Sequence, residues 1–180
     1  MAAPAPLLAL ALALAAGGGP GGAPPVPVAP PRQGTLDARR EAIAQELLRI
    51  GGALQREIEA GDVGAVLARV PAEGLRCAGQ VVPRARVERD LREPSRWLHQ
   101  TLFGAPEGAG GGAPASLRAL LVRAKEVAVM VSFRRDPRAG PVGRPCLEFR
   151  ARDLVNPAPP FCFEKQGRRW WLTESLYPCG

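Results

Sequence analysis

The stretch 161-FCFEKQGRRWWLTESLYPC-179 predicts a strand, a turn and a return strand, and it carries two of the four cysteines. Residues Phe161 to Lys165 alternate in type with the two-residue period of a β-strand. Gln166 and Gly167 supply the turn, because glycine adopts the positive φ that a two-residue hairpin turn requires. The return strand is expected from Arg168 onward. It carries large side chains on both faces, so we expect it to be buried on both sides.

The first 34 residues indicate targeting and a spacer. Residues 1–16 contain an apolar run that is too short to span a bilayer and is followed by small residues, as in a secretory signal peptide. Because no Lys or Arg precedes the run, an Ala-rich disordered leader is the alternative. Residues 17–34 are rich in Gly and Pro and predict an extended tether. We therefore expect residues 35–180 to form a single domain that is secreted, periplasmic or in the cell envelope, with no stable membrane span after signal removal.

The four cysteines, Cys77, Cys146, Cys162 and Cys179, form an even set behind this leader, which favours two disulfides. Four cysteines allow three pairings. A zinc site needs a close ligand pair such as C-x-x-C, which the sequence lacks, and His99 is the single histidine. No metal or cofactor is predicted.

The charge balance is moderately basic, with a net charge of +7. Of the 24 basic residues, all but Lys125 and Lys165 are arginine. Arginine prefers phosphate and carboxylate partners. The chain is also rich in Ala, Gly and Pro, however, so a genome-wide compositional bias is a simpler explanation for the excess of arginine over lysine. Nucleic-acid binding is therefore not expected.

Apolar periodicity predicts several helices. The best spans 36–60, with Thr35 or Asp37 as its cap, and its Gly51-Gly52 pair indicates a kink, room for a ligand or close packing against the sheet. Further helices are expected at 63–70, capped by Asp62, within 84–103 as two helices with Pro94 in the first turn of the second, and at 117–124, capped by Ser116.

Short alternating runs predict the strands. They are a short strand pair or a β-turn within 73–82, a strand at 127–133, another at 146–152 and the closing hairpin. Residues 134–144 are a Pro/Gly turn region, and 104–115 is a flexible loop, either a lid or an insertion.

This order of elements, together with 58-IEAGDVGAVLARVPAEGL-75 and 163-FEKQGRRWWLTESL-176, resembles the nuclear-transport-factor-2-like (NTF2-like) superfamily, which includes SnoaL-like and ketosteroid-isomerase-like proteins. The resemblance implies an α+β fold, in which N-terminal helices cover the concave face of a curved, mainly antiparallel sheet (a cystatin/NTF2-like cone). Many members hold a small ligand in the cone or dimerise through the sheet, so the resemblance implies a small apolar ligand or a homodimer.

Candidate site residues are few. Catalytic members of the superfamily place an Asp or a His-Asp pair in the cone, and Asp90 and His99 are the candidates here, although neither lies in a recognisable motif and both have structural interpretations. We expect a pocket, if the cone is open, to be lined by aromatic residues: Trp97, Phe133, Phe149, Trp170 and Trp171.

Three functions fit this sequence. The preferred one is an exported, non-enzymatic domain that binds a small apolar ligand or a protein partner, since no catalytic constellation is present. The second is an isomerase or dehydratase with Asp90 or His99 as acid/base. The third is an envelope module that binds an anionic polymer through its arginines. Clustering of six arginines on one face of the domain would favour this function; they are Arg84, Arg86, Arg134, Arg138, Arg150 and Arg152.

Strand alternation favours one disulfide pairing. Leu147 and Phe149 should share the inner face with Phe161, which places Cys146 and Cys162 together on the other face. A symmetric loop between these strands would leave the two cysteines about 16 Å apart, so their bridge needs an asymmetric connection or a bulge. The remaining pair would be Cys77–Cys179.

Overall fold

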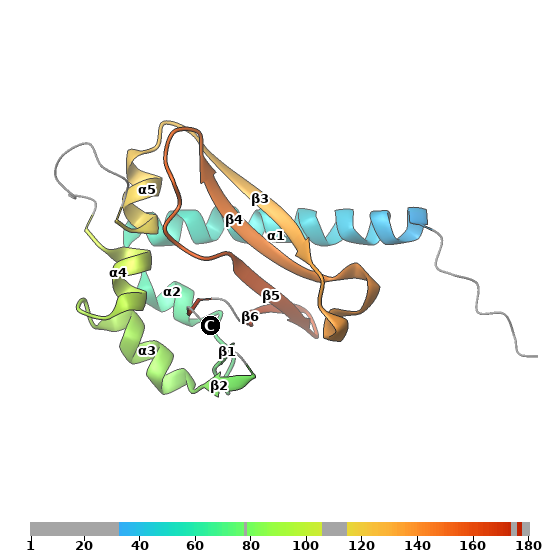
Figure 1. The fold of residues 1–180 in the computed structure, drawn as a ribbon, viewed down its shortest axis with the longest axis horizontal. Coiled ribbons are helices and arrows are strands. Elements are labelled where there is room, and N and C mark those ends of the chain that lie inside the picture. Colours follow the sequence, from blue (N-terminus) through green and yellow to red (C-terminus); the bar gives the residue numbers. More distant parts are fainter. Residues whose placement is uncertain (1–32, 78, 106–114, 174–175, 178–180) are drawn as a thin grey trace, which may run out of the picture. The chain divides into compact units, whose positions relative to one another are not determined.

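The larger β-sheet is antiparallel and has the strand order β3-β4-β5-β6 (Figure 1). Its strands are β3 (Val127–Arg134), β4 (Arg144–Ala151), β5 (Phe161–Gln166) and β6 (Arg169–Leu172). The structure, a computed structural model, describes residues 33–77, 79–105, 115–173 and 176–177. The predicted leader and all but the last two residues of the predicted tether lie outside this part of the chain.

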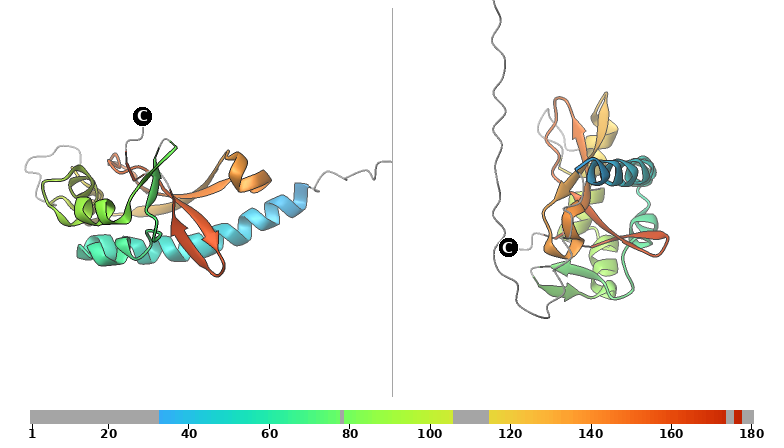
Figure 2. Two further views of the ribbon diagram at one scale, coloured as in Figure 1. Left: turned by 90° about the horizontal axis from the view of Figure 1, so that it is seen from below. Right: turned by 90° about the vertical axis from the view of Figure 1, so that its right-hand side faces the viewer.

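Helix α1 (Gln33–Ala60) packs against β3 and β4 and confirms the first predicted helix. Leu47 and Ile58 are fully buried along its apolar side, and Figure 2 shows the helix running along one side of the sheet. The predicted cap is wrong, because Thr35 and Asp37 both lie inside the helix. The backbone N–H groups that such a cap would bind already donate within the helix.

Gly51 lies where α1 packs directly against the sheet. A Cβ added to Gly51 would be 2.5 Å from Cγ1 of Val129 and 3.4 Å from Cδ2 of Leu147. The corresponding atom on Gly52 would have Nη1 of Arg56, at 3.8 Å, as its nearest neighbour. The predicted close packing is therefore confirmed at the first glycine of the pair, where a side chain has no room.

A short helix and a strand pair follow α1. Helix α2 (Val63–Leu67) is capped as predicted by Asp62, whose Oδ1 accepts a hydrogen bond from the backbone N–H of Ala65 at 3.0 Å. The helix is shorter than predicted. Strands β1 (Leu75–Cys77) and β2 (Gln80–Val82) form the expected antiparallel pair.

Three more helices are α3 (Arg84–Arg92), α4 (Trp97–Phe103) and α5 (Leu117–Arg123). The first two confirm the helices predicted within 84–103, but Pro94 precedes α4 instead of lying in its first turn. The backbone N–H of Arg96 donates to the carbonyl of Glu93 at 3.0 Å, which closes a turn with proline at its second position, where its fixed φ is favoured.

Ser116 joins the end of α4 to the start of α5. Its hydroxyl donates to the carbonyl of Gly104 at 2.7 Å and accepts from the backbone N–H of Ala119 at 3.0 Å. The predicted cap of α5 is thereby confirmed. Within the expected loop 104–115, residues 106–114 lie outside the described residues.

Strands β5 and β6 form the predicted hairpin with the turn one residue later. Gln166 pairs with Arg169, so the two turn residues are Gly167 and Arg168. Gly167 has φ +62°, a left-handed conformation that glycine adopts without steric cost. The glycine therefore occupies the first turn position, and the predicted pair Gln166-Gly167 was one residue early.

Strand β6 is an edge of the sheet and ends at Leu172. Trp170 and Trp171 are half-buried, which corrects the expectation of burial on both faces, because an edge strand is covered less completely than a central one. Beyond the strand, the carbonyl of Thr173 accepts from the backbone N–H of Arg76 at 3.0 Å. This bond joins the end of β6 to β1.

Cys146 and Cys162 form the predicted disulfide between β4 and β5. The two cysteines pair directly in register, and Leu147 pairs with Phe161. Beyond these two pairs β4 continues beside β3 without β5. The connection between β4 and β5 is therefore asymmetric, as this bridge requires.

Cys77 takes part in a second disulfide. Cys179, the predicted partner, lies outside the described residues. The Cys77–Cys179 pairing thus stays a prediction.

The core is filled by leucine and phenylalanine side chains. Phe149, Phe161 and Phe163 are among the largest fully buried residues, and the first two rings meet edge to face at 6.0 Å. The fold is thus α+β, with helices packed on antiparallel sheets, as predicted. None of the helices described is long and apolar enough to cross a membrane.

Candidate functional site

Asp90 is a carboxylate that α3 turns toward the interior. Val87 and Leu91 are fully buried on the same helix, and residues three and four positions apart share a helix face. Asp90 falls on this buried side and is 8% exposed. A carboxylate at such a position needs polar partners to offset the loss of water.

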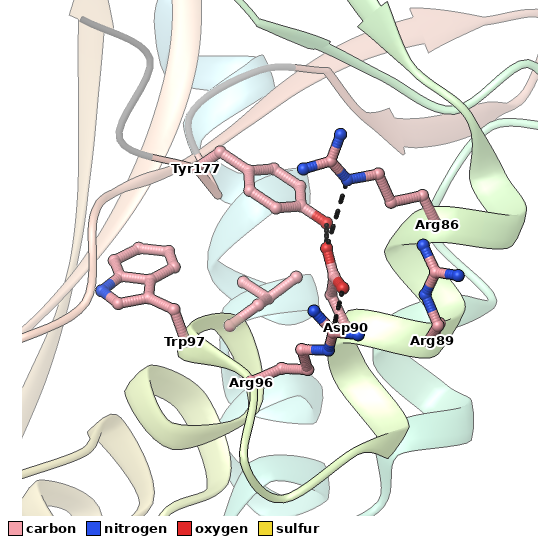
Figure 3. Close-up of a pocket in the computed structure, with 7 residues that line it drawn as sticks. Arg86, Arg89, Asp90, Arg96, Trp97 and Tyr177 are labelled. Carbon is pink, nitrogen blue, oxygen red and sulfur yellow. Dashed lines mark hydrogen bonds and ion pairs between the residues drawn. The ribbon is translucent and has the colours of Figure 1, made fainter.

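Three side chains surround the Asp90 carboxylate (Figure 3). The Tyr177 hydroxyl donates a hydrogen bond to Oδ2 at 3.1 Å. Nε of Arg86 lies 3.7 Å from Oδ2, and Nε of Arg96 lies 3.9 Å from Oδ1. Both carboxylate oxygens are therefore engaged, and Tyr177 connects the C-terminal segment to α3.

These groups border an open hollow of about 360 Å³, which we call the arginine pocket. Its lining consists of Arg86, Arg89, Asp90, Arg96, Trp97, Leu98 and Tyr177. Trp97 is 44% exposed, and Figure 3 shows its indole on one side of the pocket with the guanidinium groups of Arg86 and Arg89 on the other. The pocket thus presents aromatic surface and positive charge together.

The electrostatics of the arginine pocket are positive. Its lining carries three guanidinium groups and one carboxylate, and the Glu93 carboxylate at 2.7 Å from Arg96 offsets one further charge, which leaves an excess of one positive charge. Burial raises the pKa of Tyr177 well above its usual range, and the negative charge of Asp90 and the hydrogen bond to it act in the same direction. Tyr177 therefore stays protonated at neutral pH. The Arg89 guanidinium has no hydrogen-bond or ion-pair partner among the described residues.

Such a pocket suits an anion. Arginine holds carboxylate and phosphate groups through two parallel hydrogen bonds, and its guanidinium plane stacks on aromatic rings. Comparisons with models of protein families, with characterised protein sequences and with solved structures gave no match. What the pocket can do chemically is therefore inferred from its own groups.

His99, the second catalytic candidate, contacts a backbone carbonyl and an aromatic ring, as a histidine with a structural role does. Its Nδ1 lies 2.7 Å from the carbonyl oxygen of Leu91; because a carbonyl only accepts, Nδ1 carries the proton. The ring centroid lies 5.8 Å from that of Phe103. His99 is not part of the lining of the arginine pocket, so the structure does not bring it together with Asp90.

The five aromatic residues predicted to line a pocket lie in separate places. Trp97 lines the arginine pocket, whereas Phe149 is in the core. The Phe133 ring lies 5.6 Å below the guanidinium of Arg40. On the edge hairpin, the Trp170 indole N–H donates to Glu46 at 2.7 Å, and the Arg169 guanidinium lies 4.1 Å from the Trp171 ring.

The six arginines predicted as a possible surface cluster lie on different elements. Arg84 and Arg86 are on α3. In the register of β3 and β4, Arg134 lies opposite Arg144 at one end of the two strands. Arg150 lies opposite Ala128 near the other end. These arginines therefore lie neither on a single element nor at a single end of the β3–β4 hairpin.

Sequence reasoning missed Tyr177 and Arg89. A run of arginines such as that in residues 84–96 usually indicates the solvated face of helices, so its pattern does not single out Arg89. Tyr177 lies 87 residues from Asp90 in sequence, and no local pattern links the two. Among the described residues, no group of three or more His, Cys, Asp or Glu could hold a metal ion.

Proposed function

We propose that the protein is an exported, non-enzymatic binding domain whose arginine pocket holds the anionic group of an otherwise apolar ligand. The ligand is a small molecule or the exposed end of a protein partner. The observation that carries the proposal is the meeting of three guanidinium groups with Trp97 and Leu98 around a single hollow. An anion there gains charge-assisted hydrogen bonds, while its apolar part covers the indole.

Arg89 is the residue best suited to hold the incoming anion. Arg86 and Arg96 are partly committed to Asp90, and Arg96 also contacts Glu93 at 2.7 Å. Asp90 anchors these arginines at the rim and offsets part of their mutual repulsion. The guanidinium of Arg89 has no such commitment within the described residues.

An isomerase or dehydratase is supported less well than a binding domain. A general base needs an available lone pair within hydrogen-bond reach of a substrate proton. Asp90 accepts a hydrogen bond from Tyr177 and faces two guanidinium groups. These partners engage both carboxylate oxygens, so neither oxygen is left available to take a proton from a substrate.

The NTF2-like cone and the export of the domain remain part of this proposal. Element order supports the cone, and so does the hydrogen bond between Arg76 and Thr173, which continues the four-stranded sheet toward β1. Export is supported by the leader-like residues 1–16 and by the Cys146–Cys162 disulfide, since disulfides persist in oxidising compartments.

Calorimetric titration with a naphthalene carboxylate and with its neutral carboxamide tests the binding proposal. We expect the carboxylate to bind about tenfold more tightly, because a hydrogen bond to a charged group contributes about 1.5–3 kcal/mol. Arg89→Gln should weaken carboxylate binding by about tenfold and leave the carboxamide unchanged.

The matched control is Arg168→Gln, which removes the same charge from the exposed hairpin turn. It should bind the carboxylate like the wild type. Equal affinities for the carboxylate and the carboxamide would refute the proposal, and so would equal losses in the Arg89→Gln and Arg168→Gln proteins.

A further inference from the structure

A second group of arginines lies where β3 turns into β4. The turn contains the 3₁₀ segment η1 (Pro137–Val142), which Figure 1 shows at the end of the hairpin. Arg134, Arg135 and Arg138 are exposed there. No hydrogen bond or ion pair engages their guanidinium groups within the described residues. We call the surface formed by these three arginines and η1 the hairpin-end surface.

The carboxylate within this surface is already neutralised. Asp136 forms an ion pair with Arg144, and both side chains are largely buried. Its Oδ1 also accepts a hydrogen bond from the backbone N–H of Arg138 at 2.9 Å. Asp136 therefore holds the turn together, and the three exposed arginines keep their charge.

The backbone under the arginines is fixed from two sides. Gly143 has φ +83°, and a Cβ there would be 2.7 Å from the carbonyl oxygen of Arg134, so the two ends of the turn are in close contact. From α1, Nε of Arg40 donates to the carbonyl of Val142 at 3.1 Å. A positive surface on such a scaffold loses little backbone entropy when it binds.

The surface is hollowed rather than flat. Two hollows, of about 470 Å³ and about 300 Å³, share Arg134, Arg135 and Asp136 as lining. Pro137 lines both, and Phe133 lines the larger one. The two hollows thus combine apolar side chains with guanidinium groups.

From this arrangement we propose that the hairpin-end surface is a docking site for an extended acidic segment of a partner protein, which presents carboxylate and apolar side chains on the same face. The carboxylates pair with Arg134, Arg135 and Arg138, and the apolar side chains enter the two hollows. This site is separate from the arginine pocket, since the linings of the two share no residue.

A polypeptide fits these features better than other polyanions do. The planar surface of an anionic bilayer cannot follow two hollows, and a sulfated polysaccharide has no apolar branches for walls made by proline and phenylalanine. An extended peptide in which pairs of acidic residues follow pairs of apolar residues presents both kinds of side chain on one face, at a spacing of about 6.6 Å.

The test uses a synthetic hexapeptide of two glutamates, two valines and two glutamates in that order, a heparin hexasaccharide and vesicles of equal parts phosphatidylcholine and phosphatidylglycerol. The whole protein is titrated with each, and binding is followed by anisotropy for the labelled peptide and by sedimentation for the vesicles. We expect the acidic peptide to bind, with an affinity that falls as salt screens the charges. The double variant Arg135→Gln/Arg138→Gln should weaken peptide binding by about tenfold or more.

Two controls isolate this surface. Arg89→Gln, in the arginine pocket, and Arg168→Gln should both bind the peptide like the wild type. Tighter binding of heparin or of the vesicles than of the peptide overturns the proposal, as does unchanged peptide affinity in the double variant. The naphthalene carboxylate titration is independent, because it reports on Arg89 and not on these arginines.

Discussion

The Asp90–Tyr177 hydrogen bond holds together residues that are distant in the sequence. Asp90 was a candidate base because catalytic members of the NTF2-like superfamily, which the sequence resembles, place an Asp in the cone. Its partners, one hydroxyl and two guanidinium groups, give it a different role, which is to anchor the arginines and the C-terminal segment. A residue type therefore does not define a function until its neighbours are known.

The titration of Tyr177 is the first prediction at this scale. The chain has one tyrosine, so the ultraviolet absorbance of tyrosinate reports on this residue alone. Because burial and Asp90 raise its pKa, we expect the folded protein to show little tyrosinate at the pH near 10 where an ordinary tyrosine is half ionised. The unfolded protein in denaturant should titrate at the ordinary value.

Asp90→Asn is the matched variant for this titration. It removes the charge of Asp90 and leaves the burial of Tyr177, so the pKa of Tyr177 should move part of the way toward the ordinary value. The raised pKa of Tyr177 also fixes the direction in which the stability of the fold changes with pH. Stabilisation by a protonated Tyr177 is complete below about pH 10 and is lost as the pH rises toward the folded-state pKa. A wild-type tyrosine that titrates normally while the protein is folded would contradict this prediction.

At the scale of elements, the contact between α1 and the sheet depends on one glycine. Gly51 lies against Val129 and Leu147, whereas a Cβ on Gly52, its neighbour in the same helix, would make only an ordinary contact with the end of the Arg56 side chain. Helix propensity treats the two residues alike. The two positions differ in their contacts, because the sheet packs against the side of the helix on which Gly51 lies.

Alanine substitutions at the two glycines should therefore change stability in opposite directions. Gly52→Ala should raise the free energy of unfolding by about 1 kcal/mol, the usual gain in helix propensity. Gly51→Ala should lower it, because overpacking costs about 1–3 kcal/mol and Val129 has a stiff, branched side chain. Urea unfolding of both variants measures the difference. Equal stabilisation in the two proteins would mean that the approach at Gly51 is looser than 2.5 Å implies.

Most elements were predictable because their signals are local. The apolar period of α1, the alternation of β3 and the caps at Asp62 and Ser116 involve residues within a few positions of one another. Errors occurred at element ends. Pro94 moved out of α4, and β6 ended early, because turn hydrogen bonds and sheet edges decide such boundaries.

At the scale of the whole molecule, disulfides connect segments that are far apart in the chain. The Cys146–Cys162 bridge spans 16 residues and joins strands that share two register pairs. Cys77, on β1, is also disulfide-bonded. Its predicted bridge to Cys179 would close a loop of about a hundred residues, which stabilises by about 4–5 kcal/mol in the chain-entropy model.

Peptide mapping under non-reducing conditions checks this connectivity. We expect one linked pair of peptides carrying Cys146 and Cys162, and another carrying Cys77 and Cys179. After reduction both pairs should separate into single peptides. Recovery of Cys77 linked to Cys146 or Cys162, or of free thiols in the untreated protein, would contradict the predicted pairing and weaken the case for export.

By itself the sequence determined the α+β class, the main helix, the strand alternation and the face on which Cys146 and Cys162 meet. These follow from periodicity, which depends on side chains a few positions apart. The tertiary structure alone decided that Tyr177 reaches Asp90, that Arg86, Arg89 and Arg96 share a hollow with Trp97, and that Arg134, Arg135 and Arg138 surround a neutralised Asp136. Charge and hydrogen bonding act over a few ångströms in space, and which distant residues come that close is set by how the helices and strands pack.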